Sequence, residues 1–140
     1  MKRDPQSSCP CVSGKTFQNC CLPLLSGDQV ASTAEALMRS RYSAFVVNDM
    51  DYIFKTTDPQ ARAEFDVEAN REWSETCEFQ NLEVLKAEEN GPKAFIEFKA
   101  TYKTADGKVH IHHEYSKFRK QGGIWYFRDA KVYGESNASE

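Results

Sequence analysis

Four of the five cysteines in this 140-residue chain lie within thirteen residues, at Cys9, Cys11, Cys20 and Cys21. The surrounding stretch, residues 1–30, is rich in proline and glycine and shows no sustained helical or strand period. Such a stretch cannot build an apolar core from its own side chains. Four thiolates on two short arms complete the tetrahedral shell that zinc prefers and leave no position for water. The sequence therefore predicts one structural zinc ion per chain.

Redox chemistry is the alternative interpretation of the same cysteines. Disulfide exchange is more typical of a C-x-x-C pair or of a single activated thiol, and neither describes this cluster. The adjacent Cys20 and Cys21 would close a strained disulfide ring. We therefore expect a metal site, with redox chemistry second.

The composition is that of a folded protein of one domain, with 40% hydrophobic and 28% charged residues. A net charge of -3 argues against a broad nucleic-acid-binding surface, which needs clustered lysine and arginine. The sequence has no apolar run long enough for a membrane span and no apolar segment typical of a secretory signal. We expect a cytoplasmic protein without membrane or nucleic-acid partners.

The pattern after residue 30 predicts helices followed by strands. Helices are expected at 33–48, 51–55 and 66–76, with Ser32 and Glu35 as a capping box for the first and Asp51 as the cap of the second. Strands are expected at 78–88, 93–104, 109–120 and 124–133, separated by turn sequences rich in glycine and asparagine. This order predicts an α+β fold with three helices on one face of a four-stranded antiparallel sheet. The predicted organisation is a knuckle at 1–30, an α+β domain at 31–134 and a flexible tail at 135–140.

The segment CPCVSGKTFQNCC resembles the SEC-C motif, a zinc-binding knuckle at the C-terminus of the SecA preprotein-translocase motor and in many other bacterial proteins. It departs from that motif at Val12, where the family usually has glycine, and at Thr16, Gln18 and Asn19, where lysines are common. In SecA the element docks the chaperone SecB and the ribosome. The resemblance therefore implies a protein partner for the knuckle.

A second resemblance, to the YchJ family of uncharacterised bacterial proteins, spans nearly the whole chain. It is carried by residues 36–45, Asp51-Tyr52, Lys55-Thr56, Trp73, Leu82, Glu114, Ser116, Phe118 and Trp125-Tyr126. It implies a nuclear-transport-factor-2-like (NTF2-like) cone, in which a curved sheet wraps a long helix, behind an N-terminal SEC-C knuckle. The family carries no established activity that the resemblance would transfer.

Arg41 lies within the apolar stripe of the first predicted helix, four residues after Leu37 and four before Phe45. A buried guanidinium needs a carboxylate or several carbonyls, because desolvating it otherwise costs several kcal/mol. Strand alternation places Glu114 and Asp129 on inward faces. We therefore expect Arg41 to pair with one of these two carboxylates.

A cone closed by a helix leaves a cavity at its open end, where ligands are expected to bind. The predicted pocket is lined by Arg41, Tyr42, Trp73, Glu114, Tyr126 and Asp129. The competing interpretation is that these side chains fill the core and satisfy one another.

The three histidines offer a second, weaker metal hypothesis. His110, His112 and Glu114 alternate onto one strand face, while His113 points the other way. Same-face neighbours on a strand lie about 7 Å apart, which is wide for three ligands of one ion. We expect these histidines to be partly exposed and free of metal.

These features are compatible with three functional classes. We favour a structural or protein-interaction module in which the zinc knuckle presents a surface and the cone is its scaffold. The alternatives are a small-molecule-binding protein that uses the cone pocket, and an enzyme in which Glu114 or Asp129 acts as general base while Arg41 or Tyr42 orients an anion. The sequence assigns no catalytic residue.

Overall fold

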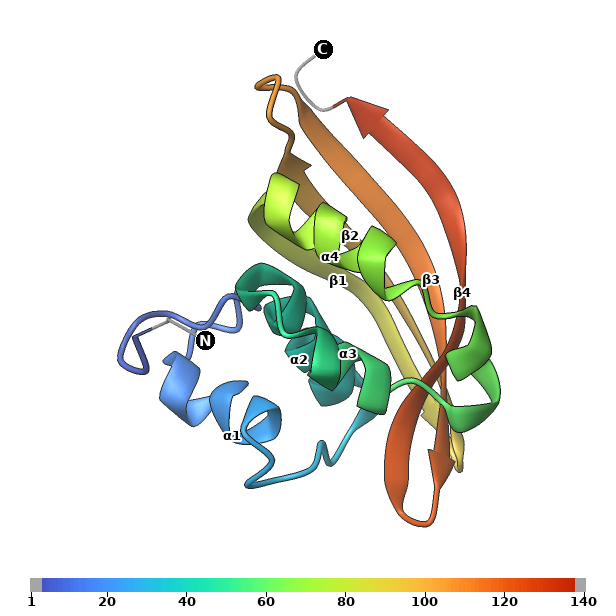
Figure 1. Ribbon diagram of the computed structural model, residues 1–140. Coiled ribbons are helices and arrows are strands. Elements are labelled where there is room, and N and C mark those ends of the chain that lie inside the picture. Colours follow the sequence, from blue (N-terminus) through green and yellow to red (C-terminus); the bar gives the residue numbers. More distant parts are fainter. Residues whose placement is uncertain (1–3, 138–140) are drawn as a thin grey trace.

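A four-stranded antiparallel sheet forms one side of the protein, in a computed structural model that describes residues 4–137 (Figure 1). The strands are β1 (Glu78–Asn90), β2 (Lys93–Lys103), β3 (Val109–Gln121) and β4 (Ile124–Asn137), and they lie in the order β1-β2-β3-β4. The predicted meander is therefore confirmed. Register shifts in the β1–β2 and β3–β4 pairs bend and twist the sheet, because each inserts extra residues on one strand.

β4 is longer than the sequence predicts. Its pairing with β3 continues until His110 faces Asn137, so residues 135–137 are strand and not the start of a tail. Residues 138–140, the rest of the predicted tail, lie outside the described residues.

The three predicted helices are present as α2 (Ala34–Val47), α3 (Met50–Lys55) and α4 (Val67–Thr76). Two predicted caps are wrong. α2 begins after Thr33, whose side chain accepts a hydrogen bond from the Ala36 N–H at 3.0 Å, and α3 begins after Asp49, which accepts from the Tyr52 N–H at 3.1 Å. The predicted helix count is also too low, since the described chain adds α1 (Leu22–Leu25) and the 3-10 helices η1 (Phe17–Asn19) and η2 (Pro59–Glu64).

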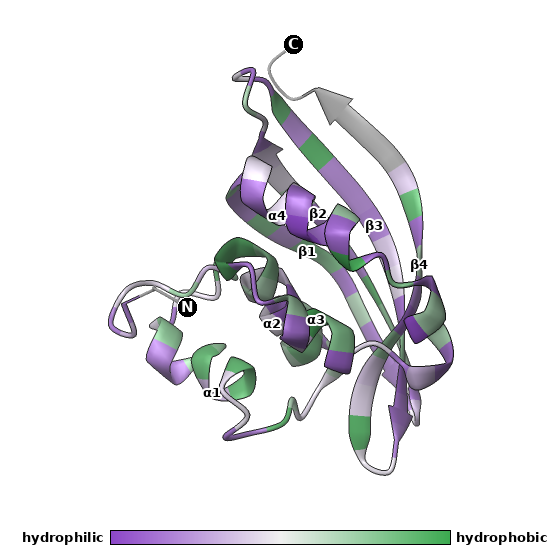
Figure 2. Ribbon diagram, viewed as in Figure 1, coloured by the Kyte–Doolittle hydropathy of each residue, from purple (hydrophilic) through white to green (hydrophobic). Residues whose placement is uncertain are grey.

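Helix α2 lies between the sheet on one side and the cysteine-containing segment on the other (Figure 1). Apolar residues make up much of α2, α3 is mixed, and α4 is mostly hydrophilic (Figure 2). A single core cluster joins the three layers. It includes Phe17 and Leu25 of the knuckle, Leu37 and Met38 of α2, and Ile96 of β2. The knuckle therefore packs as part of the domain rather than as a separate unit.

Among the described residues, no helix has both the length and the apolar character needed to cross a lipid bilayer.

Candidate metal centre and adjoining cavity

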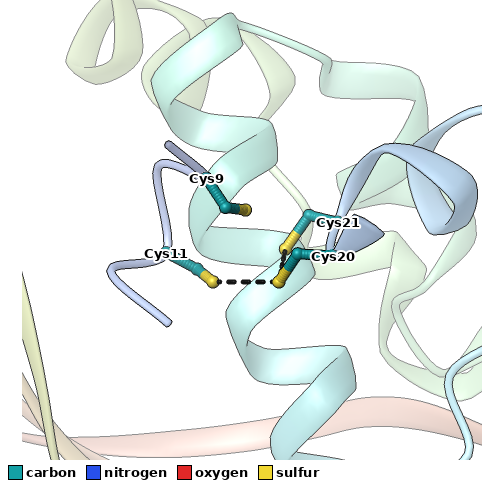
Figure 3. A group of neighbouring side chains, drawn as sticks. All are labelled: Cys9, Cys11, Cys20 and Cys21. Atoms are coloured by element: carbon teal, nitrogen blue, oxygen red, sulfur yellow. Dashed lines mark hydrogen bonds between the residues drawn. The ribbon is translucent and has the colours of Figure 1, made fainter. Parts of the chain in front are cut away.

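The four clustered cysteines approach one another from two arms of the chain (Figure 3), and residues 12–19 join these arms. Cys9 and Cys11 lie on the first arm, and Cys20 and Cys21 follow η1 on the second. A backbone hydrogen bond from Cys9 N to Lys15 O, at 2.9 Å, helps to close this connecting segment. Gly14 and Val12 take left-handed conformations, with φ of 90° and 62°. The second value explains the glycine that is usual at this position in SEC-C motifs, because a β-branched residue is strained there.

The spacing of the sulfur atoms fits a tetrahedral metal ion. All four Sγ atoms lie within 4.8 Å of one another, with Cys11 to Cys20 at 3.5 Å and Cys20 to Cys21 at 3.9 Å. Zinc–sulfur bonds of about 2.3 Å would separate the sulfur ligands of a tetrahedral ion by about 3.8 Å. All four cysteines are free thiols. The donor set and its geometry therefore suit a metal ion.

The electrostatics of the cluster favour a cation at its centre. Hydrogen bonds from Cys11 and Cys21 lower the pKa of Cys9, and the hydrogen bonds of Cys21 to Cys11 and Cys9 raise the pKa of Cys21. Burial raises the pKa of Cys20 to about 11. The thiols thus share protons when they have only one another as partners. A bound divalent cation would allow all four to be thiolates.

Side chains around the cluster tie it to α2. The Ser43 hydroxyl lies 3.7 Å from Cys9 Sγ, and the Arg39 guanidinium donates from Nη1 to the Cys11 carbonyl at 2.8 Å. Arg39 Nε also donates to Glu35 at 3.1 Å. Burial pulls the pKa of Arg39 down, but the Glu35 hydrogen bond and the nearby Cys11 charge raise it overall. The positively charged Arg39 side chain therefore ties the Cys11 backbone to α2.

A cavity of about 700 Å³ lies between the helices and the inner face of the sheet. Five of the six residues predicted to line a pocket line it: Arg41, Tyr42, Trp73, Glu114 and Asp129. Tyr126 does not line it. It alternates along β4 with Trp125 and Phe127, whose side chains face the helices, so Tyr126 lies on the opposite face of the sheet.

The expected pairing of Arg41 with Glu114 or Asp129 is wrong. Within the described chain, neither carboxylate lies within 4.0 Å of the guanidinium. Arg41 Nη1 instead donates to the Ile53 carbonyl at 3.0 Å and to the hydroxyls of Thr56 and Thr57. The Ile53 carbonyl lies in the last turn of α3, where carbonyls lack helical partners, and Thr56 and Thr57 follow the helix.

Glu114 has other partners. One carboxylate oxygen contacts His112 Nε2 at 2.8 Å, and the other accepts from the Ser116 hydroxyl. His110 instead contacts the Thr104 hydroxyl at 3.1 Å, and His113 contacts Glu97 at 2.7 Å on the outer face. The histidines therefore face different partners, and the cysteine cluster is the metal-ligand group found among residues 4–137.

One residue with an important role has no counterpart among the predicted site residues. Asp58 is completely buried, and its Oδ2 lies 3.1 Å from Arg119 Nη2 and accepts from Gln121 Nε2 at 3.1 Å. In the sequence Asp58 stands out only as the residue before Pro59. The adjacent backbone pairs with the edge of β4, which fixes the turn that carries Thr57 and Ala61 into the cavity wall.

Comparisons with known proteins agree with this architecture. Residues 33–130 match a family described as YchJ, middle NTF2-like domain, and residues 7–23 match the SEC-C motif. A UPF0225 protein of Geobacter sulfurreducens is 44% identical over 124 residues, which cover 86% of this chain and 76% of that protein. A UPF0225 protein of Vibrio parahaemolyticus is 40% identical, with 96% and 80% covered.

Two solved structures are similar along most of the chain. The solution structure of a SEC-C motif-containing protein from Rhodopseudomonas palustris has a TM-score of 0.84 at 45% identity, and covers 90% of this chain and 98% of that one. The crystal structure of a SEC-C motif-containing protein from Psychrobacter arcticus has a TM-score of 0.79 at 36% identity, with 93% and 85% covered.

Proposed function

Because the chain belongs to the YchJ family of UPF0225 proteins, with an NTF2-like domain behind a SEC-C motif, we propose that its knuckle is a zinc-ordered protein-interaction module on a cone-shaped scaffold. The observation that carries the proposal is the close approach of four free thiols at a spacing that suits tetrahedral zinc. One zinc ion per chain would be structural, because four thiolates leave no open coordination position.

The surface beside the cluster supports a docking role. A hollow between the knuckle and α2 is bordered by Val12, which is 49% exposed, and by Val30, which is 65% exposed. Lys15 and Arg39 line the same hollow. Glu35 also lines the hollow and pairs with Arg39 at 3.1 Å, so Lys15 is the lining cation that has no ion pair among the described residues. Exposed aliphatic side chains beside Lys15 suit a partner segment that is mainly apolar. The zinc ion would hold this surface in shape without touching the partner.

Metal content is the first test. Elemental analysis of reduced protein is expected to find one zinc per chain, and the Cys20→Ser, Cys21→Ser double variant should lose it. Cys77→Ser is the matched control, because it removes the fifth thiol and should retain the metal. Substoichiometric metal in the wild type, or full metal in the double variant, would contradict the proposal.

Partner capture is the second test. Cross-linking and affinity capture should enrich a protein with the wild type and lose it with Val30→Asp, which leaves the four cysteines unchanged. A partner that is retained by both Val30→Asp and the double cysteine variant would place the interface elsewhere and refute the docking role.

Small-molecule binding by the NTF2-like domain is the second candidate function. The volume of about 700 Å³ supports it, since ligand pockets typically occupy roughly 300–1,000 Å³. The enzyme alternative would use Glu114, which His112 and Ser116 hold in place, as a general base. An enzyme must bind a substrate, so a small molecule that binds the cavity has to be identified before catalysis can be tested.

A further inference from the structure

The cavity combines apolar walls with one unusual cation, and the ligand class inferred for it rests on the small-molecule-binding role proposed for the NTF2-like domain. Trp73 is the centre of an aromatic group on the wall, with ring centroids 5.3 Å from Phe45, 5.0 Å from Phe79 and 5.7 Å from His112. Phe98 and Phe127 line the same space. These rings offer an apolar, flat-sided enclosure.

Arg41 is incompletely satisfied by the protein. Its Nη1 donates to the oxygens at the end of α3, and its guanidinium carbon lies 4.4 Å from the centre of the Phe127 ring. Within residues 4–137, neither Nε nor Nη2 donates a hydrogen bond, and no carboxylate lies within ion-pair distance of the group. Burial lowers the pKa of Arg41 to about 10, although the charge of Glu114 offsets part of this effect, so the group remains charged at neutral pH. Arg41 is half-buried, and its Nε and Nη2 are not among the fully buried polar atoms, so both remain open to a partner in the cavity. An anion that joins such a partly desolvated cation stabilises it.

The remaining charges limit which anion fits. Arg128 also lines the cavity, and its Nε lies 4.0 Å from Asp58, the carboxylate that it shares with Arg119. Four carboxylates line the cavity or its mouth: Glu64, Asp66, Glu114 and Asp129. Such a field disfavours phosphates and other polyanions and tolerates a single negative charge. The planar edge formed by Nε and Nη2 matches a carboxylate, which can accept two parallel hydrogen bonds.

We propose that this cavity binds a small aromatic monocarboxylate, with its carboxylate on the Nε and Nη2 edge of Arg41 and its ring among Phe45, Trp73 and Phe98. Tyr42 also lines the space, and its hydroxyl makes no hydrogen bond within the described chain. Neither the SEC-C motif nor the zinc site takes part in this binding.

The test compares 2-naphthoate with 2-naphthamide, two probes of the same shape that differ in charge. Dissociation constants are measured by calorimetry on the full metal-loaded chain, and backbone amide NMR shifts locate the probe. The carboxylate should bind at least about 10-fold more tightly than the amide, the size expected for charge-assisted hydrogen bonds to a half-buried cation. Shifts should be concentrated in α2, α4 and the inner face of the sheet.

Variants then assign the preference to Arg41. Arg41→Gln should reduce the difference in affinity between the two probes to about 2-fold or less, because glutamine cannot make charge-assisted hydrogen bonds to the carboxylate. Arg71→Gln is the matched control, because Arg71 lies on α4, pairs with Glu68 and does not line the cavity. Glu114→Gln should tighten naphthoate binding several-fold, because it removes a like charge. Ala69→Trp adds bulk at an exposed position of the cavity lining and should weaken both probes.

The outcomes distinguish the carboxylate assignment from the more general proposal that the NTF2-like domain binds a small molecule. Equal affinity for the two probes in the wild type overturns the carboxylate assignment while small-molecule binding stands. Failure of both probes to bind at millimolar concentration overturns both. A preference that persists in folded Arg41→Gln, or shifts outside the cavity, also refutes the assignment. If Arg41→Gln does not fold, the wild-type ratio and Ala69→Trp decide the question.

Discussion

Replacing Asp58 with alanine is expected to destabilise the protein by about 3 kcal/mol, because this carboxylate joins the turn after α3 to the sheet. Asp58 is 0% exposed, and no other carboxylate among the described residues is so deeply buried. Its Oδ1 accepts a hydrogen bond from the Gln60 N–H at 2.9 Å. Its Oδ2 forms an ion pair with Arg119 and accepts a hydrogen bond from Gln121, each at 3.1 Å. Alanine removes these three interactions and the longer contact with Arg128 Nε at 4.0 Å.

The magnitude follows from these contacts. Loss of the cap to Gln60 costs about 1 kcal/mol. Loss of charge-assisted hydrogen bonds costs about 1.5–3 kcal/mol. Breaking a fully buried pair costs about 3–5 kcal/mol, but the Arg119 side chain is 34% exposed and can regain water when its partner is removed. The lower end of that range is therefore expected.

Urea unfolding at neutral pH measures the effect. With a slope of about 1.5 kcal/mol per molar, the Asp58→Ala midpoint should fall by about 2 M. Asp66→Ala is the matched control, because exposed Asp66 caps α4 through the Ala69 N–H at 3.0 Å and has no described ion pair. That variant should lose only about 1 kcal/mol. Equal midpoint shifts for the two variants, or additive effects of Asp58→Ala and Arg119→Met, would refute the ion-pair reasoning.

Three further predictions concern the knuckle and the cavity. Val12→Gly should stabilise the metal-loaded protein by up to about 1 kcal/mol in thermal unfolding, because glycine removes the strain at φ 62°; an unchanged or lower midpoint counts against this. Phe17→Ala, at a fully buried position, should lower stability by about 3 kcal/mol in one cooperative transition, whereas a separate early transition would mean that the knuckle unfolds independently. Burial raises the pKa of Tyr42 to about 12, so the unfolded chain loses this proton first and stability should fall as pH rises from about 10 to about 12. Tyr42→Phe should show a shallower fall in urea midpoints over that range, and an identical pH profile would contradict the raised pKa.

Features that depend on neighbours along the chain are well predicted. The cysteine pairs, the order of helices and strands, and the glycine-rich turns all follow from short-range spacing. Errors at this level are small, such as the α2 cap at Thr33 in place of Ser32. The position of Tyr126 is also predictable in principle, because strict alternation with Trp125 and Phe127 places it on the outer face.

Contacts between distant segments could not be predicted. Asp58 meets Gln121 across 63 positions of sequence, and no local pattern marks either residue as the partner of the other. For Arg41 the sequence indicates the need for compensating oxygens, but only packing shows that α3 supplies them and that Glu114 is occupied by His112 and Ser116.

The sequence by itself determined the group of four thiols that suits a metal ion and the succession of elements, because four thiols on two short arms and the periodicity of apolar residues are local properties. The tertiary structure alone decided that the knuckle shares the core of the NTF2-like domain, that Asp58 is buried, and that Arg41 faces a cavity without a contacting counter-ion. These features arise from the distances between elements that meet only when the sheet curves around α2, and hydrogen bonding and desolvation depend on those distances.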